Sequence, residues 1–528
     1  MSHPAATPRI LETSDVFLIF LGLYLLSARV SPPFSDAAPM WEAARNLVRH
    51  GTFAISERWP VNAPTGRGGH FYPVAALLAV LVHVPGAFAH LLLARAVPAQ
   101  SDVFEVMASQ MGPLVVGAST PALLFRLLRH QDYDRRAAAW VALLAGMGTS
   151  VWVYARCPYS EILQAACFTL FLDALLEAGR LSTTRSFLWL GFSFGLLINT
   201  KNIYSLCIPG AFVFLWTRQR LRPRALATAS WAALGAAPGL IALGIYNVVR
   251  WRSPFNSGYD GITTGFWSQN IVWGLWGQLF SPGKSVFLYS PPILLALFGV
   301  RRLVARRASV ALAIALTVFP IVLVYARYMF WAGDWSWGPR YLVFALPALA
   351  LPIAELLSDH EPLRRATRVA LPAFLALGLA VQVLGCAIRW DDYMEIARQA
   401  QQAWLGRPDR GGTPLAPYPC FSCFEEVYGA EWLPPMQPIL GHLWLLRHRI
   451  AGDGWRAAEA DAAWKRYTSL TLDIHRTYEQ GGIDWWLMDA PPGRRAATAA
   501  IMASLLALAL PRKAWRNTLR LGPAPQKT

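Results

Sequence analysis

The stretch ASVALAIALTVFPIVLVYA, residues 308–326, contains no charged side chain. An α-helix needs about 20 predominantly apolar residues to cross the hydrocarbon core of a bilayer, so this stretch predicts a transmembrane helix. Similar apolar stretches recur along the chain. We predict twelve spans, at 15–31, 107–127, 137–154, 161–178, 186–200, 203–217, 226–249, 285–300, 308–326, 341–357, 369–388 and 496–511.

The composition of the whole chain supports a membrane protein. Hydrophobic residues make up 55% of the 528 residues, and charged residues only 15%, whereas soluble domains carry about 25% charged residues. This excludes a soluble, collagen-like or disordered chain. We therefore predict an all-α polytopic membrane protein.

The net charge of +17 could indicate a nucleic-acid partner, but topology explains it better. Lys and Arg accumulate in cytoplasmic loops. The apolar segment 72–96, broken by Pro85-Gly86, decides whether the basic loop at 126–136 joins the other basic loops on one face. The positive-inside rule favours a hairpin or interfacial helices for 72–96, with both termini cytoplasmic and no nucleic acid bound. The expected location is a bacterial cytoplasmic membrane, with the active site on the periplasmic face.

The predicted organisation has three parts. A transmembrane domain, 1–388, carries four outer loops, and a small mixed extracytoplasmic segment, 389–495, follows it. The last helix and a basic cytoplasmic tail occupy 496–528. The outer loops are 32–106, 154–161, 250–284 and 327–341.

The first outer loop contains SPPFSDAAPMWEAARNLVRHG, 31–51, whose apolar residues recur on one helical face. This pattern predicts an amphipathic helix on the membrane surface, with Gly51 as its C-cap. Asp36 lies where this helix begins. Its local pattern favours a helix N-cap, and the alternative is a carboxylate poised at the membrane–water boundary. Glu42 is expected to pair with Arg45 or Arg49.

The second outer loop, YARCPYSE at 154–161, contains Arg156 and Glu161 near the membrane interface. Charged groups at such positions usually pair with each other. The alternative is that Glu161 faces the first loop. In that case Asp36 and Glu161 would offer oxygen ligands that suit Mg²⁺ or Mn²⁺.

Three cations on the outer face run against the positive-inside bias: Lys201, Lys284 and Arg340. An anionic lipid head group is one reason to keep them, because Arg grips phosphate oxygens in a bidentate manner and Lys acts as a point charge. The structural alternative is that Arg340 pairs with Asp334 inside an interfacial belt of Trp residues.

The chain has six cysteines, and two of them form CFSC at Cys420 and Cys423. No βαβ unit surrounds this motif, so a redox role is disfavoured, and no second ligand pair suggests zinc. A local disulfide is the prediction for an oxidising compartment.

Several motifs in order resemble the GT-C superfamily of polytopic glycosyltransferases, and among them the bacterial family-39-like, phospholipid-carrier-dependent branch. The resemblance covers most of 14–388, and the order of the motifs carries it. After Asp36 and its helix come GMGTSVWVYARCPYSE (146–161), INTKN (198–202), YNVVRWRSPFNSGY (246–259), FSPGKSVFLYSPPILLALFG (280–299) and WAGDWSWGPRYLVFALP (331–347).

The resemblance implies transfer of a sugar, with inversion, from a polyprenyl phosphate on the outer leaflet to a glycan, lipid or protein. It favours Asp36 as the base, Glu161 as the acidic residue of the second loop, and Arg340, Lys201 and Arg156 as partners of the lipid phosphate. Many relatives carry two adjacent acidic residues in the first loop, whereas Asp36 stands between Ser35 and Ala37, which leaves metal dependence open. The weaker site candidates are Glu42, His70, Tyr72, Lys284, Asp334 and Tyr341.

Two other functions suit a polytopic protein with outer cations. A flippase or transporter of lipid-linked sugars would tend to show internal repeats and broken helices at mid-membrane, and we find no repeat. An O-antigen-type ligase works on the same face with pyrophosphate-linked donors, and no sequence feature excludes it.

Overall fold

In the part of the chain that it describes, the structure, a computed structural model, contains helices joined by loops and no strand beyond two isolated β-bridges at Phe71. The predicted all-α polytopic fold is confirmed. The predicted span 496–511, the CFSC cysteines Cys420 and Cys423, Asp334 and most of 389–495 lie outside the described residues. Those described are 11–56, 64–219, 225–259, 266–333, 335–357, 364–405, 428–432, 434–451 and 484–485.

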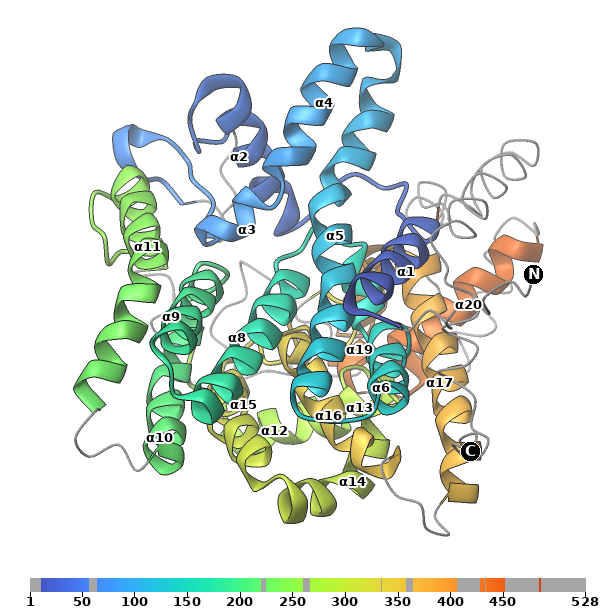
Figure 1. Ribbon diagram of the computed structural model, residues 1–528. Coiled ribbons are helices and arrows are strands. Elements are labelled where there is room, and N and C mark those ends of the chain that lie inside the picture. Colours follow the sequence, from blue (N-terminus) through green and yellow to red (C-terminus); the bar gives the residue numbers. More distant parts are fainter. Residues whose placement is uncertain are drawn as a thin grey trace, which may run out of the picture.

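The helices follow one another closely along the chain (Figure 1). Those of the first 200 residues are α1 (Thr13–Leu26), α2 (Ala37–His50), η1 (Arg67–Gly69), α3 (Leu77–Leu81), α4 (Val84–Ala96), η2 (Pro98–Gln100), α5 (Ser101–His130), α6 (Arg135–Gly148), α7 (Val151–Ala155), α8 (Glu161–Leu181) and α9 (Thr184–Ile198). The later ones are η3 (Asn202–Leu206), α10 (Cys207–Gln219), α11 (Ala225–Trp251), α12 (Ile271–Phe280), α13 (Val286–Tyr289), α14 (Ile293–Arg306), α15 (Ala308–Arg327), η4 (Arg340–Ala345), α16 (Leu346–Leu357), α17 (Arg364–Ala387), α18 (Trp390–Leu405), α19 (Tyr428–Trp432), η6 (Pro434–Met436) and α20 (Pro438–Ala451).

Seven helical stretches of the described chain are long and apolar enough to cross a membrane by length and composition. Shorter apolar helices, α1, α9 and α12, accompany them. The seven are Leu77–Ala96, Pro98–His130, Glu161–Leu181, Ala227–Trp251, Ala308–Arg327, Arg340–Leu357 and Ala366–Ala387.

Two predicted spans are interrupted in the structure. The span predicted at 137–154 breaks between α6 and α7, where Thr149 adopts an extended backbone. The span predicted at 285–300 breaks at Ser290, because Pro291 and Pro292 lack the N–H groups that would continue helix α13. The helix resumes as α14, so the apolar run at 285–300 does not form one straight span.

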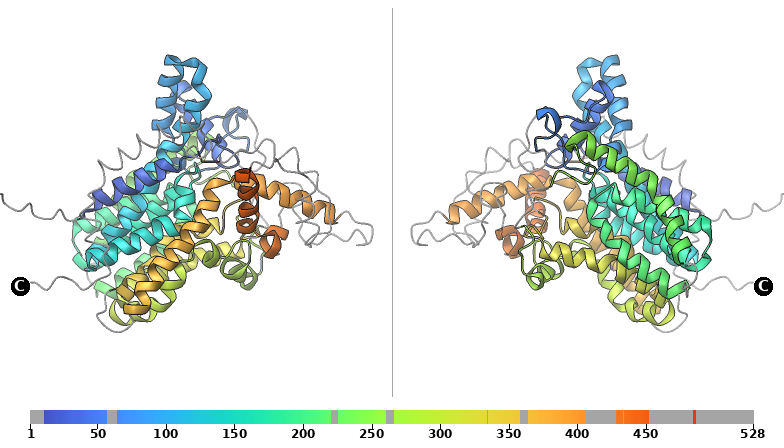
Figure 2. Two further views of the ribbon diagram at one scale, coloured as in Figure 1. Left: turned by 90° about the vertical axis from the view of Figure 1, so that its right-hand side faces the viewer. Right: turned by 90° about the vertical axis from the view of Figure 1, so that its left-hand side faces the viewer.

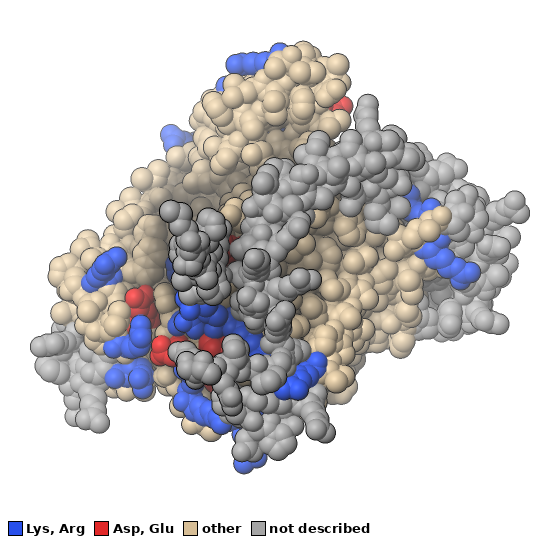
Figure 3. Space-filling view, turned by 45° about the vertical axis from the view of Figure 1, so that its right-hand side comes forward, with Lys and Arg blue, Asp and Glu red and all other residues tan. Residues whose placement is uncertain are grey.

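The apolar segment around 72–96 contributes to a helical hairpin. Its helix α4 packs against the first half of α5, and the chain turns at η2 between them. The contact is close, because a Cβ on Gly86 would lie 2.0 Å from the Ala108 carbonyl oxygen, and one on Gly112 would lie 1.9 Å from that of Val82. The hairpin projects beyond the bundle, and charged side chains are sparse on the face seen in Figure 3. A hairpin within 72–96 is therefore not what the structure shows, because Pro85 and Gly86 lie inside α4 and the second arm is the start of α5.

Two of the basic loops, 126–136 and 301–307, meet at one end of the bundle. The Tyr133 hydroxyl, between α5 and α6, donates to Glu355 Oε1 near the end of α16 at 2.5 Å. Arg307, between α14 and α15, pairs with the same carboxylate at 3.2 Å and donates to the Gln131 carbonyl. At the opposite end of the bundle, α8 begins at Glu161, and η4, which begins at Arg340, leads into α16. Helix α18 extends to one side of the bundle (Figure 2).

Helices α9 and α11 pack through paired small residues. Gly191 and Gly195 on α9 face Gly235 and Gly239 on α11, which is the spacing that lets membrane helices approach closely. A Cβ on Gly191 would lie 1.9 Å from the Ala232 carbonyl oxygen, and one on Gly239 would lie 2.6 Å from that of Gly195. A Cβ atom at Gly191, Gly235 or Gly239 would require one helix to move, whereas at Gly195 the contact of 3.2 Å would only be tight.

We expect Gly191→Val to destabilise the folded protein by about 1–3 kcal/mol, because the added atoms must push α11 away from α9. The matched control is Gly244→Ala on α11, whose Cβ would meet only the Pro254 Cβ at an ordinary 3.6 Å. Thermal unfolding of both variants in detergent measures the difference. Equal midpoints for Gly191→Val and the wild type would contradict the close packing.

Candidate functional site

Arg340, at the start of η4, joins two outer loops through their carboxylates. Its Nη2 atom lies 2.8 Å from Asp36 Oδ2, and its Nε atom lies 3.5 Å from Glu161 Oε1. The side chains differ in exposure, at 30% for Asp36, 10% for Arg340 and 5% for Glu161. We call these three residues the Arg340 cluster. Its guanidinium separates an accessible carboxylate from a buried one.

Asp36 does not cap helix α2 with its side chain. It occupies the N-cap position with helical backbone angles, φ −56° and ψ −25°, and its carboxylate makes no capping hydrogen bond. The N-cap interpretation is therefore wrong for the side chain. The preceding Ser35 adopts φ 50°, a left-handed conformation that costs a non-glycine residue about 1–2 kcal/mol. Such strain is typical of functional positions, and here it accompanies the turn that presents Asp36 to Arg340.

Lys284 binds the loop that precedes Arg340. This lysine is fully buried, and its Nζ atom donates to the carbonyl and hydroxyl oxygens of Ser336 at 2.9 and 3.0 Å. Gly333 and Gly338 take left-handed φ values of 79° and 64°, which glycine adopts at little cost. Lys284 therefore supports the loop that carries Arg340, and its ammonium group is already committed there.

Lys201 approaches the cluster through two stacked tyrosines. The rings of Tyr325 and Tyr341 lie 4.4 Å apart and 6° from parallel. Lys201 Nζ lies 4.9 Å from the Tyr341 ring centre and 5.4 Å from that of Tyr325. Arg340 Cζ is 5.2 Å from the same Tyr341 ring. In the described part of the chain, Lys201 contacts rings and no carboxylate, so two cations converge beside Tyr341.

Two further tyrosines belong to this environment. Tyr159 lies in the second outer loop, where burial raises the pKa of its phenol well above the ordinary value, with Asp391 and Asp36 adding to the effect. Tyr259 ends the motif at 246–259, and burial likewise raises the pKa of its phenol, while nearby Lys201 opposes the shift. Both phenols stay protonated and can donate hydrogen bonds. Sequence reasoning quoted the motif but did not single out Tyr259.

Glu161 keeps one buried oxygen available. Its Oε2 atom has no hydrogen-bond partner within the described residues, although the side chain is 5% exposed. Buried carboxylate oxygens are nearly always hydrogen-bonded in native proteins. A hydrogen-bond donor on a bound ligand would satisfy this atom.

Three of the weaker candidates, Glu42, His70 and Tyr72, take other positions or roles. Glu42 Oε1 accepts from the Ser56 N–H and hydroxyl at 2.7 and 2.6 Å, whereas Arg45 pairs with Glu105, so the predicted Glu42 pairing is wrong. His70 is exposed, and Tyr72 packs edge-on against Trp251. Asp334 lies outside the described residues.

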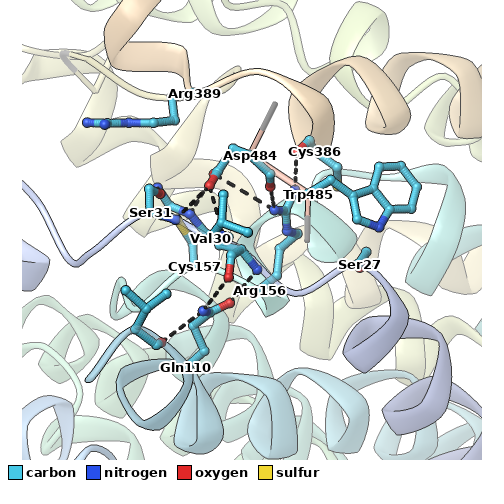
Figure 4. Close-up of polar contacts among 12 residues, drawn as sticks. Ser27, Val30, Ser31, Gln110, Arg156, Cys157, Cys386, Arg389, Asp484 and Trp485 are labelled. Atoms are coloured by element: carbon cyan, nitrogen blue, oxygen red, sulfur yellow. Dashed lines mark hydrogen bonds and ion pairs between the residues drawn. The ribbon is translucent and has the colours of Figure 1, made fainter. Parts of the chain in front are cut away.

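Arg156 is buried at 2% exposure in a separate network (Figure 4). Its guanidinium donates to the carbonyl oxygens of Cys386 and Asp484, and it lies 3.8 Å from Asp484 Oδ2. We therefore assign Arg156 to the support of the second loop.

The fold and the site together define a multi-pass membrane protein that gathers carboxylates, cations and phenols at the end of the bundle opposite its basic loops. No known family and no curated protein matches the sequence. Among solved structures, ArnT from Cupriavidus metallidurans bound to undecaprenyl phosphate is similar, with 15% identity over 88% of this chain and 83% of that one, at a TM-score of 0.46.

The apo oligosaccharyltransferase of Archaeoglobus fulgidus is also similar, with 12% identity over 77% of this chain and 60% of that one, at a TM-score of 0.43. The same enzyme tethered to an acceptor peptide matches with 13% identity over 75% and 57%, at a TM-score of 0.46. These likenesses concern only the general arrangement of helices. The functional argument below rests on the side chains of this chain.

We expect Arg340→Ala to destabilise the protein by about 3–5 kcal/mol, because it leaves the buried Glu161 carboxylate without its cation. Adding Glu161→Gln removes that charge, so the double variant should recover much of the loss. Thermal unfolding of both single variants and the double variant measures the coupling. Additive losses would show that Arg340 and Glu161 do not interact energetically.

Proposed function

We propose that this protein is an inverting glycosyltransferase of the bacterial cytoplasmic membrane. It would move a hexose or pentose from a polyprenyl-phosphate donor to a hydroxyl group of a glycan, lipid or protein on the outer face. The observation that carries the proposal is the Arg340 cluster, in which one guanidinium lies between an accessible carboxylate and a buried one.

Asp36 is the proposed general base. An acceptor hydroxyl must lose its proton as its oxygen attacks C1 of the sugar, and a carboxylate within hydrogen-bond reach accelerates this step by about 10²–10⁴-fold. Asp36 is the most exposed carboxylate of the cluster, at 30%, so an acceptor arriving from water meets it first. Inversion requires the base and the leaving phosphate on opposite faces of the sugar.

Arg340 and Lys201 are the proposed partners of the leaving phosphate. The phosphate gains charge as the C1–O bond breaks, and preorganised cations stabilise that charge in a site with little water. Both cations border the Tyr341 ring, so one phosphate can lie between them. A phosphate that binds Arg340 competes with Asp36 for the guanidinium and releases the carboxylate to act as base.

The position of the cluster suits a lipid-linked donor. Glu161 begins α8, and Arg340 precedes α16, so the site lies at one end of apolar helices. The basic loops lie at the other end, where Tyr133, Arg307 and Glu355 meet. By the positive-inside rule the cluster then faces the outer side. The isoprenoid chain can stay in the bilayer while its phosphate reaches the cations.

Our proposal assigns no metal to the site. The sequence suggests that Asp36 and Glu161 could share Mg²⁺ or Mn²⁺, but the Arg340 guanidinium lies between them. The described chain contains no group of three or more His, Cys, Asp or Glu side chains with metal-binding geometry. Arg340 supplies the positive charge in our proposal, and no step is assigned to a metal.

We expect EDTA to lower the transfer rate by less than about threefold, because preorganised guanidinium and ammonium groups can stabilise the leaving phosphate. The assay measures free polyprenyl phosphate by mass spectrometry in proteoliposomes, with and without added Mn²⁺. Loss of activity in EDTA with recovery on Mn²⁺ addition would contradict the assignment of the charge to Arg340.

We expect Asp36→Asn to lower donor-dependent release of polyprenyl phosphate by about 10²–10⁴-fold, because the amide cannot take the acceptor proton. The test uses purified protein in liposomes with a panel of polyprenyl-phosphate sugars and cell-extract acceptors. Glu42→Gln is the matched control, since Glu42 lies on the same helix and contacts Ser56.

Equal release by Asp36→Asn and the wild type would remove Asp36 from the chemistry. Two other functions have distinct outcomes in the same assay. A flippase would move the donor between leaflets without releasing polyprenyl phosphate. A ligase would release polyprenyl pyrophosphate from pyrophosphate-linked donors and would ignore the monophosphate panel.

A further inference from the structure

Asp484 and Trp485 lie near the carboxy-terminal end of the described chain. They contact the starts of the two outer loops that carry Asp36 and Glu161 (Figure 4). Asp484 lies 455 positions from Arg29, and its Oδ2 atom is 2.7 Å from Arg29 Nε. Its exposure is 4%, equal to that of Arg29. We call Asp484, Arg29, Arg156 and Cys157 the Asp484 network.

One side of this network fixes the first outer loop. Asp484 Oδ1 accepts the backbone N–H groups of Val30 and Ser31 at 3.3 and 3.1 Å. Arg29 Nη2 also donates to the Ser31 hydroxyl at 2.6 Å. Ser31 precedes Asp36 by only a few residues of loop. The carboxylate therefore sets the course of the chain just before the proposed base.

The other side of the network fixes the second outer loop. Arg156 donates to the Asp484 carbonyl, and Arg29 Nη1 donates to Cys157 Sγ at 2.7 Å. This loop leads directly to Tyr159 and Glu161. Asp484 thus joins the segments that carry both acidic residues of the Arg340 cluster, because its carboxylate binds Arg29 and its backbone carbonyl accepts from Arg156.

The charges in the network depend on each other. Burial by itself would raise the pKa of Asp484, but the guanidinium groups of Arg29 and Arg156 lower it, and the net effect is a pKa below the ordinary value. Loss of this carboxylate would leave two buried guanidinium groups without their shared counter-ion. The loops would then have to open to hydrate them.

We propose that Asp484 is a positioning residue for the transferase site, acting through Arg29 and Arg156 to hold the loops of Asp36 and Glu161 in reach of Arg340. This inference rests on the proposed function. It assigns to Asp484, a residue close to the carboxy-terminal end, a role in supporting the site. Trp485 strengthens the attachment, since its Nε1 atom donates to the Leu26 carbonyl at 2.6 Å and its ring packs edge-on against Trp152.

The first test measures the contact without using activity. Cys157 is buried, and burial raises the pKa of its thiol to about 12, so it should resist alkylation in the wild type. We expect Asp484→Asn to increase the alkylation rate of Cys157 by at least about tenfold, measured by peptide mass spectrometry, because the thiolate form and solvent access both increase. Asp484→Glu should lie between the two.

Asp173→Asn is the matched control. Asp173 is 1% exposed and pairs with Arg126 at 2.8 Å, at the other end of α8. This variant also removes a buried carboxylate from an arginine, so it reports general destabilisation. Alkylation of Cys157 that rises equally in Asp173→Asn and Asp484→Asn would overturn the local role of Asp484. If Asp484→Asn does not fold, Trp485→Phe is the second variant. It removes the hydrogen bond to the Leu26 carbonyl but keeps an aromatic ring against Trp152.

The second test separates positioning from folding. In the polyprenyl phosphate release assay, we expect Asp484→Asn to lower kcat by about tenfold or more while the donor KM stays within about twofold, because misplaced catalytic groups slow chemistry more than binding. Asp484→Glu should restore part of kcat. Faster alkylation of Cys157 with an unchanged kcat would overturn the positioning role. If the wild type releases no polyprenyl phosphate, the proposed function is refuted. The alkylation rates then test only whether Asp484 holds the loop of Cys157.

Discussion

The ion pair between Arg340 and its two carboxylates is the interaction on which the outer face of this protein depends. Three loops that are distant in sequence meet there, and each contributes a charge that would be costly to bury alone. Glu161, at 5% exposure, needs the guanidinium more than Asp36 does. Glu161 therefore anchors Arg340 on its buried side, and Asp36 pairs with it on the side open to solvent.

The bundle uses the same principle at both ends. At the basic end, Glu355 draws together Tyr133 and Arg307, and Asp173 holds Arg126. At the outer end, Asp484 holds Arg29 and Arg156. Apolar helices in a bilayer gain little by packing against each other through the hydrophobic effect alone, because lipid tails are equally apolar. Close glycine contacts between α9 and α11 and charge pairs at the helix ends supply specificity. In a water-soluble protein the burial of a hydrophobic core would contribute to it.

The sequence predicts the membrane class well, because the length of an apolar run is a local signal, and local signals also select its candidate site residues. Apolar run length predicts the spans, and cations on the outer side stand out against the positive-inside bias, which identified Lys201, Lys284 and Arg340. The structure brings Asp36, Glu161 and Arg340 together. It also corrects the N-cap reading of Asp36, since a helix N-cap and an ion-pair partner have the same local sequence and only the fold decides between them.

The parts that the sequence does not predict are those that depend on distant pairs. Nothing near Asp484 indicates that its partners are Arg29 and Arg156, because no local spacing relates positions 455 residues apart. The same reasoning explains why Arg156 suggested a phosphate partner: an outer arginine looks the same whether its counter-ion is a lipid or a carboxylate from the end of the chain. Whether an arginine is free for a ligand depends on which carboxylates the fold brings to it. Here Arg156 is committed to a buried network, whereas Arg340 pairs with an accessible carboxylate, which in our proposal a phosphate displaces.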